Sequence, residues 1–219
     1  MPVYELSDEL VFPHPKLAES DGLLAVGGDL CVDRLILAYM NGIFPWFNED
    51  DPILWWAPKS RYVIFPEKIH ISKSMKRLIN KVERGEEFQV TYNKDFRKVI
   101  RACGDIRRNK DGTWITEDMI EAYCKLHEEG YAESVEVWYE GKLVGGIYGV
   151  VIGRCFFGES MFSTMSNTSK LALIYLCKVL EEEGFKFLDC QFHTNHLESM
   201  GGEEIDFEKY YKYIEEGLE

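Results

Sequence analysis

The chain has 219 residues, of which 46% are hydrophobic and 14% aromatic, and its formal net charge at pH 7 is −13. This composition excludes a disordered polymer and suffices for one large hydrophobic core or two modest ones. The N-terminus is acidic where an export signal would be positive, and the charge-free run 143–153 is far shorter than the roughly 20 residues of a membrane span. We therefore expect a cytoplasmic protein without a membrane partner, with its six scattered cysteines reduced.

The charge is distributed unevenly along the chain. Residues 61–110 hold 14 Lys and Arg residues but only 6 Asp and Glu residues, whereas the remainder holds 11 and 32. A basic block inside an acidic chain favours an anionic partner at one site, because the rest of the surface repels polyanions such as nucleic acid. Chance clustering on a solvated face is the alternative interpretation, and charge alone does not separate the two.

Residues 1–62 are rich in turns and aromatic rings. One short helix is predicted here at residues 33–40, and Gly42 follows its end. Four aromatic residues of this segment lie within a few residues of a proline: Trp46, Phe47, Trp55 and Trp56. We expect these rings in loops, either as a small aromatic core or as rigid walls on which an adenine or an apolar side chain stacks. The segment is predicted to form a small domain, with residues 63–219 forming a second one.

A cationic amphipathic helix is predicted over residues 72–85. Its apolar positions repeat at a spacing of three and four residues, which places them on one helical face: Met75, Leu78, Ile79 and Val82. The opposite face is basic and consists of Lys73, Lys76, Arg77, Lys81 and Arg84. Ser72 is suited to cap the helix, and Gly85 is suited to end it. Such a face is expected of a helix that contacts a phosphate backbone, although a solubilising face has the same pattern.

The rest of the chain alternates strands and helices. Strands are predicted at residues 88–93, 134–139, 142–152, 154–161 and 186–192. Helices are predicted at residues 95–103, 116–129, 168–183 and 207–216. The resulting order, β-α-α-β-β-β-α-β-α, is that of a Gcn5-related acyltransferase fold, in which helices flank a mixed sheet. We therefore predict an α+β protein: a small N-terminal domain followed by a Gcn5-related acyltransferase-like (GNAT-like) domain.

The segment between the fourth strand and the next helix argues against coenzyme A as the acyl carrier. Coenzyme A enzymes of this fold place a glycine-rich loop there, whose backbone N–H groups bind the pyrophosphate. Residues 162–170 contain no glycine, and no Walker or GxGxxG motif follows a strand. An aminoacyl ester on tRNA is an alternative activated carrier, and it would also explain the basic block. We expect no cofactor and no metal, since Cys190, His193 and His196 lack a fourth ligand at zinc spacing.

Six segments in series resemble the motifs of the bacterial leucyl/phenylalanyl-tRNA–protein transferase family. They are residues 21–30, Gly42-Ile-Phe-Pro-Trp-Phe47, Ile53-Leu-Trp-Trp-Ala-Pro58, Gly112-Thr-Trp-Ile-Thr116, Phe157-Gly-Glu-Ser-Met-Phe-Ser163 and Leu188-Asp-Cys-Gln191. The resemblance covers nearly the whole chain. It implies a monomeric enzyme that transfers leucine, phenylalanine or methionine from aminoacyl-tRNA to proteins whose N-terminal residue is Arg or Lys, which marks them for degradation.

The resemblance also implies which residues handle the acceptor amine. Asp189 and Gln191 stand two apart on a predicted strand, so we expect them on one face, acting on the amine. They either relay its proton or only position it while the tRNA hydroxyls move the proton. Glu159 and Met161 are likewise two apart on the preceding strand. Glu159 is expected at the mouth of the pocket, where a carboxylate suits an acceptor with an ammonium and a basic side chain.

The donor contacts follow from the same resemblance. The amino-acid pocket is expected to be walled by Ile147, Met161, Leu173 and Leu176. Ile147 and Leu176 stand where the best-known members have Met and Phe, so the preference among Leu, Phe and Met stays open. Trp46 and Trp114 are expected to stack on the terminal adenosine of tRNA. The expected phosphate contacts are Lys73, Lys76, Arg77 and Lys81.

Two alternatives to this function stay open. They are a coenzyme A-dependent N-acetyltransferase and a non-catalytic module that binds tRNA or protein N-termini.

Overall fold

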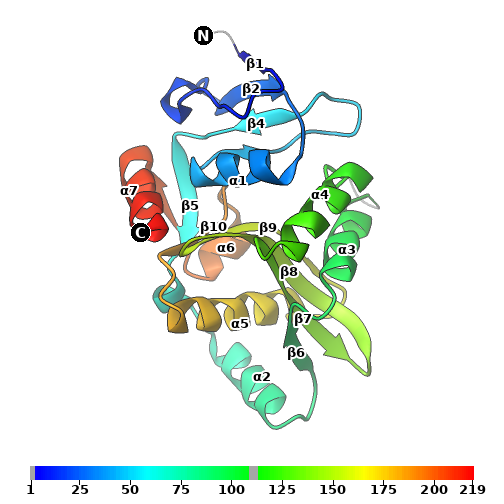
Figure 1. The fold of residues 1–219 in the computed structure, drawn as a ribbon. Helices are drawn as coiled ribbons and strands as arrows, with labels where there is room; N and C mark the ends of the chain where they lie inside the picture. Colours follow the sequence, from blue (N-terminus) through cyan, green and yellow to red (C-terminus); the bar gives the residue numbers. More distant parts are fainter. Residues whose placement is uncertain (1–2, 109–112) are drawn as a thin grey trace.

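The computed structural model describes residues 3–108 and 113–219, so Gly112 of the fourth motif lies outside the described residues. Seven strands form the central sheet: β5 (Ser60–Ile64), β6 (Gln89–Tyr92), β7 (Ala132–Tyr139), β8 (Lys142–Ile152), β9 (Cys155–Ser163), β10 (Phe187–Asp189) and β11 (Glu203–Asp206). Their order in the sheet is β11-β5-β10-β9-β8-β7-β6 (Figure 1). Neighbouring strands are antiparallel except β10 and β9, which are parallel.

Helices cover both faces of this sheet. The helices of the described residues are α1 (Val32–Met40), α2 (Lys73–Glu83), α3 (Phe96–Arg108), α4 (Glu117–Glu128), α5 (Thr168–Glu182), α6 (Asn195–Ser199) and α7 (Phe207–Leu218). Short 3₁₀ turns lie at Pro15–Leu17 and Pro66–Lys68. Helices α1, α3 and α4 lie on one side of the sheet and α5 on the other (Figure 1). None of the helices in the described ranges is long and apolar enough to cross a bilayer.

Two hydrophobic clusters follow from this arrangement. The first contains buried side chains of α1, α3, α4 and α7, and the second contains those of α2 and α5. Successive residues of one strand enter different clusters: Phe157 of β9 belongs to the first and Phe156 to the second. This alternation is what the pleat of a strand produces when both faces of its sheet are covered.

The N-terminal segment forms a second, smaller sheet. Its strands are β1 (Tyr4–Leu6), β2 (Leu23–Gly27), β3 (Phe44–Pro45) and β4 (Leu54–Trp56), in the order β1-β2-β4-β3. The expectation that the aromatic residues of this segment lie in loops is wrong for Trp55 and Trp56, because strands this short give no readable alternation. Trp55 packs in the same hydrophobic cluster as Phe157. The expected boundary after residue 62 falls inside β5, and the division into two domains stays a prediction.

Most predicted elements of the larger part of the chain are confirmed, together with several of their ends. The Ser72 hydroxyl accepts the backbone N–H of Met75 at the start of α2. Glu140 and Gly141 both have positive φ, at 48° and 73°, in the turn between β7 and β8. Two strands of the central sheet, β5 and β11, and the short helix α6 were not predicted, and β10 is shorter than expected. The predicted fold class, a mixed sheet flanked by helices with a small N-terminal part, is confirmed.

Candidate active site

A cavity opens in the central sheet where β10 stops and β9 continues. β10 pairs with β9 only as far as Asp189, which lies opposite Phe157. Gln191 has a left-handed backbone conformation, with φ of 58°, which turns the chain away from β9. The two strands separate from this point on. The gap is a cavity of about 300 Å³, and its walls come from β3, β9, the segment before α4 and the segment after β10.

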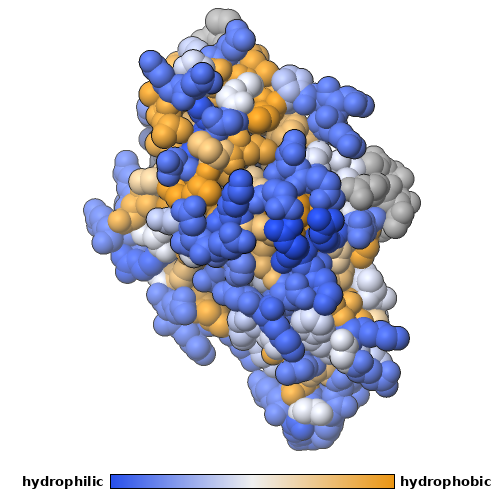
Figure 2. All heavy atoms as spheres, turned by 45° about the vertical axis from the view of Figure 1, so that its right-hand side comes forward, coloured by the Kyte–Doolittle hydropathy of each residue, from blue (hydrophilic) through white to orange (hydrophobic). Residues whose placement is uncertain are grey.

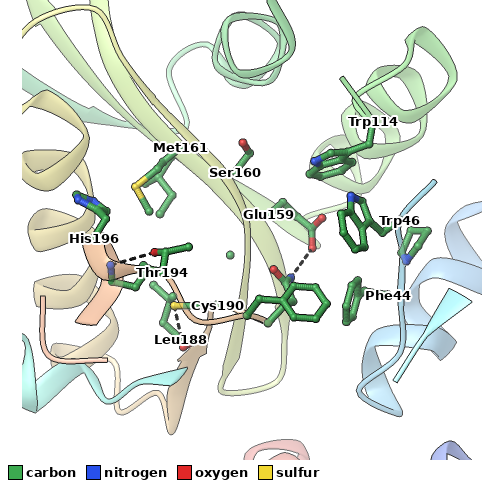
Figure 3. Close-up of a pocket in the computed structure, with 16 residues that line it drawn as sticks. Phe44, Trp46, Trp114, Glu159, Ser160, Met161, Leu188, Cys190, Thr194 and His196 are labelled. Atoms are coloured by element: carbon green, nitrogen blue, oxygen red, sulfur yellow. Dashed lines mark hydrogen bonds between the residues drawn. The ribbon is translucent and has the colours of Figure 1, made fainter. Parts of the chain in front are cut away.

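The cavity has two chemically different ends (Figure 3). Around one end lie a carboxylate and three aromatic rings, those of Glu159, Phe44, Trp46 and Trp114. Around the other end lie the apolar side chains of Met161 and Leu188, together with those of Cys190, Thr194 and His196. Gln191 also lines the cavity and donates a hydrogen bond to Glu159, so it belongs to the first end. An ester with an apolar side chain fits the second end, and an amine fits the first.

A β-bulge aims the Glu159 side chain. The pairing of β8 with β9 shifts register between Gly158 and Ser160, which leaves Glu159 as the extra residue. The expectation that Glu159 and Met161 share one face is therefore wrong. Glu159 accepts hydrogen bonds from α1 and α4, whereas Met161 packs against the cluster that contains α5. Both side chains still line the cavity, because the cavity lies in the gap of the sheet.

Glu159 is held by a network of buried hydroxyl groups. The Tyr39 hydroxyl donates to Oε1 at 2.7 Å, and the Tyr123 hydroxyl donates to Oε2 at 3.3 Å. The Nε2 group of Gln191 also donates to Oε1, at 3.3 Å. Burial raises the pKa of the Glu159 carboxyl to about 7, although the hydrogen bonds from the two tyrosines act to lower it. This carboxyl therefore changes charge near neutral pH.

Sequence reasoning missed both tyrosines of this network. Tyr39 lies in the helix predicted at residues 33–40, and Tyr123 lies on the apolar face of the helix predicted at residues 116–129. A tyrosine hydroxyl on a buried helix face usually has a hydrogen-bond partner. That rule was the available signal, but it does not identify the partner, which is 120 residues from Tyr39 in sequence.

Asp189 lies behind the cavity wall rather than in it. Its side chain is 0% exposed, and Asp189 is not among the residues that line the cavity. The Tyr210 hydroxyl donates to Oδ2 at 2.7 Å, and Nη2 of Arg61 lies 3.2 Å from the same oxygen. The backbone N–H of Gln191 donates to Oδ1 at 2.8 Å. The expectation that Asp189 and Gln191 lie on one face of a strand is wrong, because β10 ends at Asp189.

Aromatic rings form the rim of the polar end. Trp46 and Trp114 both line the cavity, and Trp46 is 42% exposed. The Trp46 ring lies 5.7 Å from that of Trp56 and 5.6 Å from that of Phe192. Phe44 contacts Phe192 edge to face at 6.0 Å. The structure thus brings the two predicted stacking residues to one cavity and adds Phe44 and Phe192, which the sequence did not single out.

The apolar end contains two of the four residues predicted for the amino-acid pocket. Ile147 of β8 pairs with Met161 of β9, and both line the cavity. Leu173 and Leu176 of α5 are 0% and 3% exposed and belong to the same hydrophobic cluster as Ile147, but they are not among the lining residues. His196, which was considered only as a metal ligand, also lines this end.

Helix α2 stands apart from the cavity. In Figure 1 it projects from the lower end of the molecule, on the side of α5 away from the N-terminal sheet. The same end is largely hydrophilic in Figure 2. All four cations predicted to bind phosphate are exposed: Lys73, Lys76, Arg77 and Lys81. Lys81 forms an ion pair with Glu87 at 2.8 Å.

The three residues considered for zinc do not converge. Cys190 and His196 line the cavity, whereas His193 is exposed and lies 3.1 Å from the carboxylate of Glu198. Across residues 3–108 and 113–219, no three His, Cys, Asp or Glu side chains gather closely enough to hold a metal ion.

The strands of the central sheet have the order β11-β5-β10-β9-β8-β7-β6, and β9 and β10 separate beside the buried carboxylate of Glu159. These two features are those of an acyltransferase-like protein. A family model described as leucyl/phenylalanyl-tRNA protein transferase matches residues 63–215, and a model of the N-terminal domain of that family matches residues 28–59. The chain therefore belongs to the leucyl/phenylalanyl-tRNA–protein transferase family, and it is an aminoacyltransferase.

Curated relatives support the same assignment. A leucyl/phenylalanyl-tRNA–protein transferase of Flavobacterium johnsoniae is 53% identical over 209 residues, which cover 95% of this chain and 97% of that protein. One of Desulforapulum autotrophicum is 51% identical over 220 residues, which cover 100% of this chain and 94% of that protein. Among solved structures, FemX has a TM-score of 0.50 at 12% identity, covering 84% of this chain and 71% of that one, and this similarity concerns the fold alone.

Proposed function

We propose that this enzyme transfers leucine, phenylalanine or methionine from aminoacyl-tRNA to proteins whose N-terminal residue is Arg or Lys, and that the transfer marks these proteins for degradation. The observation that supports this proposal best is the single cavity with an apolar end at Met161 and a carboxylate and amide end at Glu159 and Gln191. Aminoacyl-tRNA is made in the cytoplasm, so we place the reaction there.

The donor would occupy the apolar end and the aromatic rim. Its side chain would contact Ile147 and Met161, with Leu173 and Leu176 supporting this wall from the core. The terminal adenosine would stack between Trp46 and Trp114, a mode that tolerates any tRNA because every tRNA ends in the same nucleoside. The ester carbonyl would then lie between the two ends of the cavity, near Gln191.

The acceptor amine would be bound by Gln191 and Glu159. A carboxylate accepts hydrogen bonds only, so the amide of Gln191 presents its NH₂ group to Glu159, at 3.3 Å. The carbonyl oxygen of Gln191 then remains to accept a hydrogen bond from the amine. Glu159 adds negative charge for an acceptor that carries an α-ammonium and a basic side chain. Asp189 would act through Gln191, whose backbone it holds.

The reaction needs one bond to form and one to break. The acceptor ammonium loses a proton, and its nitrogen attacks the ester carbonyl to form the amide bond. The ester C–O bond breaks, and the leaving ribose oxygen takes up the second proton that the nitrogen loses. The ester supplies the driving force, so the proposed transfer needs no ATP, coenzyme A or metal. The first proton passes to solvent. The pKa of Glu159, about 7, suits a carboxylate that binds the ammonium in its charged form at and above neutral pH.

The body of the tRNA would contact α2. Lys73, Lys76 and Arg77 are exposed on one helix and carry charges that suit successive phosphates. Lys81 would exchange its partner Glu87 for a phosphate. Because these are contacts to the backbone, they would contribute little to the choice among tRNA sequences.

The test is a transfer assay with purified components. We would incubate the enzyme with leucyl-tRNA labelled in its amino acid and a peptide that begins with Arg, in EDTA and without ATP or coenzyme A. The matched peptide differs only in beginning with Asp. We expect label in the Arg peptide alone, because the Asp side chain would bring a second negative charge next to Glu159.

Three results would contradict the proposal. A strict requirement for coenzyme A would favour the N-acetyltransferase alternative. Binding of leucyl-tRNA without transfer to the Arg peptide would favour a non-catalytic module. Efficient transfer to the Asp peptide would overturn the proposed acceptor specificity.

A further inference from the structure

Arg61 of β5 is a buried cation that the proposed chemistry does not use. Its side chain is 1% exposed, and its guanidinium carbon lies 4.8 Å from the ring centroid of Phe44 and 4.6 Å from that of Tyr210. Replacing a buried ion pair by apolar side chains of similar volume is often neutral or even stabilising. Stability alone therefore gives little reason for a charge at this position.

One nitrogen of Arg61 connects two loops of the cavity wall. Nη2 donates to the carbonyl oxygen of Gly42, in the turn after α1, and lies 3.2 Å from Oδ2 of Asp189, at the end of β10. Trp46 follows Gly42 by four residues, and Gln191 follows Asp189 by two. The side chain therefore links the loop that carries the proposed adenosine platform to the loop that carries the proposed amine-binding group.

Tyr210 of α7 completes this network. Its hydroxyl donates to Oδ2 of Asp189 at 2.7 Å and accepts from Nη2 of Arg61 at 2.8 Å. The turn at Gly42 packs on the same ring, since a Cβ atom at position 42 would lie 2.7 Å from Cε1 of Tyr210. Gly42 also has a φ of 65°, so this position requires glycine. The C-terminal helix thereby fixes both loops at one point.

The Asp189 side of the network sets the conformation of Gln191. A left-handed backbone is unfavourable for a residue with a Cβ atom, and it persists where the surroundings fix it. Oδ1 of Asp189 holds the N–H of Gln191 at 2.8 Å, and the carbonyl of Gln191 accepts the N–H of Tyr62 at 3.3 Å. With its backbone held in this way, the side chain of Gln191 reaches Glu159.

We propose that Arg61 and Tyr210 are positioning residues for the transfer, which set the distance between the Trp46 platform and Gln191 without touching either substrate. This inference rests on the proposed function. A misplacement of about 1 Å can lower a rate by about 100-fold, so residues that only position the two loops can have a large effect on kcat. The positioning role of residue 61 requires Arg rather than Lys, since a guanidinium presents its hydrogen-bond donors in fixed directions.

Tyr210→Phe tests the link to Asp189, because it removes the hydroxyl and keeps the ring on which Gly42 packs. The matched control is Tyr213→Phe on the same helix, whose ring contacts Phe65 and Phe187. We expect Tyr210→Phe to lower kcat about tenfold with the KM for leucyl-tRNA changed by less than about twofold, because the platform stays in place. Tyr213→Phe should leave kcat and KM unchanged.

Arg61→Lys tests the second link, to Gly42. It should lower kcat at least as much as Tyr210→Phe and, in addition, raise the KM for leucyl-tRNA, since the turn before Trp46 loses its anchor. The double variant Arg61→Met/Asp189→Leu separates position from stability. It removes both charges at similar volume, so its urea midpoint should stay close to that of the wild type, while kcat stays about 100-fold lower.

The outcomes distinguish this inference from the proposed function. Full kcat in Tyr210→Phe, or wild-type transfer by the double variant, would overturn the inference. A loss of activity that disappears once rates are corrected for the folded fraction would also overturn it, because a merely structural role would produce that result. Absence of transfer by the wild-type enzyme in the same assay would instead contradict the proposed function.

Discussion

The cavity and helix α2 both carry charged side chains, but they hold them in different ways. Glu159 and Asp189 are 8% and 0% exposed, and each receives hydrogen bonds or an ion pair from three different residues. Lys73 and Lys76 are exposed on a surface helix. Inside the cavity, the low dielectric strengthens each contact and penalises each unpaired group, whereas charges on α2 are solvated and screened by salt.

This difference predicts large effects of single substitutions in the cavity and small, roughly additive effects on α2.

Asp189→Asn should have the largest effect, because it leaves the buried Arg61 guanidinium without a charged partner. Breaking a buried pair in this way lowers the free energy of unfolding by about 3–5 kcal/mol. We also expect kcat to fall about 100-fold, since Gln191 loses a rigid anchor, while leucyl-tRNA binding changes little. Urea denaturation and single-turnover transfer measure the two effects, with exposed Asp8→Asn as the control. Weaker donor binding with normal turnover would place Asp189 on the donor side.

Glu159→Gln should mainly weaken acceptor binding. A hydrogen bond to a charged group contributes about 1.5–3 kcal/mol, so the KM for an Arg-starting peptide should rise about 10- to 100-fold at pH 8. A peptide with a neutral first side chain should be affected less. If both peptides lose equally, Glu159 serves the donor or the fold instead.

The pH profile should follow the Glu159 carboxyl. Its pKa of about 7 lies above the ordinary value of 4.5, so kcat/KM for an Arg-starting peptide should fall as the pH drops below 7, by about tenfold per unit. Because the folded protein holds this proton more tightly than the unfolded chain, Glu159 lowers stability as the pH rises from 4.5 through 7. Glu159→Gln should therefore match wild-type stability at pH 5 and exceed it at pH 8 by about 1–3 kcal/mol.

A profile that keeps its acid limb in Glu159→Gln would assign the limb to another group. Equal pH dependence of the two unfolding free energies would show that burial does not shift this carboxyl.

Met161→Ala and Leu176→Ala should separate the cavity wall from the core behind it. Met161 lines the cavity, so its truncation should lower kcat/KM for leucyl-tRNA about tenfold relative to phenylalanyl-tRNA, by leaving space beside the smaller side chain. Leu176 is 3% exposed and lies outside the lining, so its truncation should instead lower the free energy of unfolding by about 2–5 kcal/mol with the donor preference retained. A changed donor preference in Leu176→Ala would show that the occupied pocket extends to α5.

The triple variant Lys73→Ala/Lys76→Ala/Arg77→Ala should have the smallest effect. Each true phosphate contact that is lost should reduce the log–log salt slope of tRNA binding by about 0.7–0.9, and kcat should stay near the wild-type value. Affinity is measured by titration at several salt concentrations. A slope equal to that of the wild type would show that this face of α2 only keeps the protein in solution.

Local elements were readable from sequence because their signals are local. The spacing of Met75 and Ile79 and the cap at Ser72 predicted α2, and all three act within one or two helical turns. The strands of the N-terminal sheet gave no such signal, since they are two to five residues long and include Pro45. The end of β10 was also misread, because its stop depends on a left-handed residue, Gln191, that is not glycine.

By itself, the sequence determined most helices and strands in the larger part of the chain, although it missed β5, α6 and β11, and its motifs identified the family. It also named Glu159, Gln191, Met161, Trp46 and Trp114, which meet in one cavity. Only the tertiary structure decided how these groups are held. The bulge that aims Glu159, the hydroxyls of Tyr39 and Tyr123, and the burial of Asp189 against Arg61 and Tyr210 all depend on contacts between segments that are distant in the chain. Sequence periodicity reports which face of an element is buried, but it carries no information about which distant polar group a buried side chain will meet.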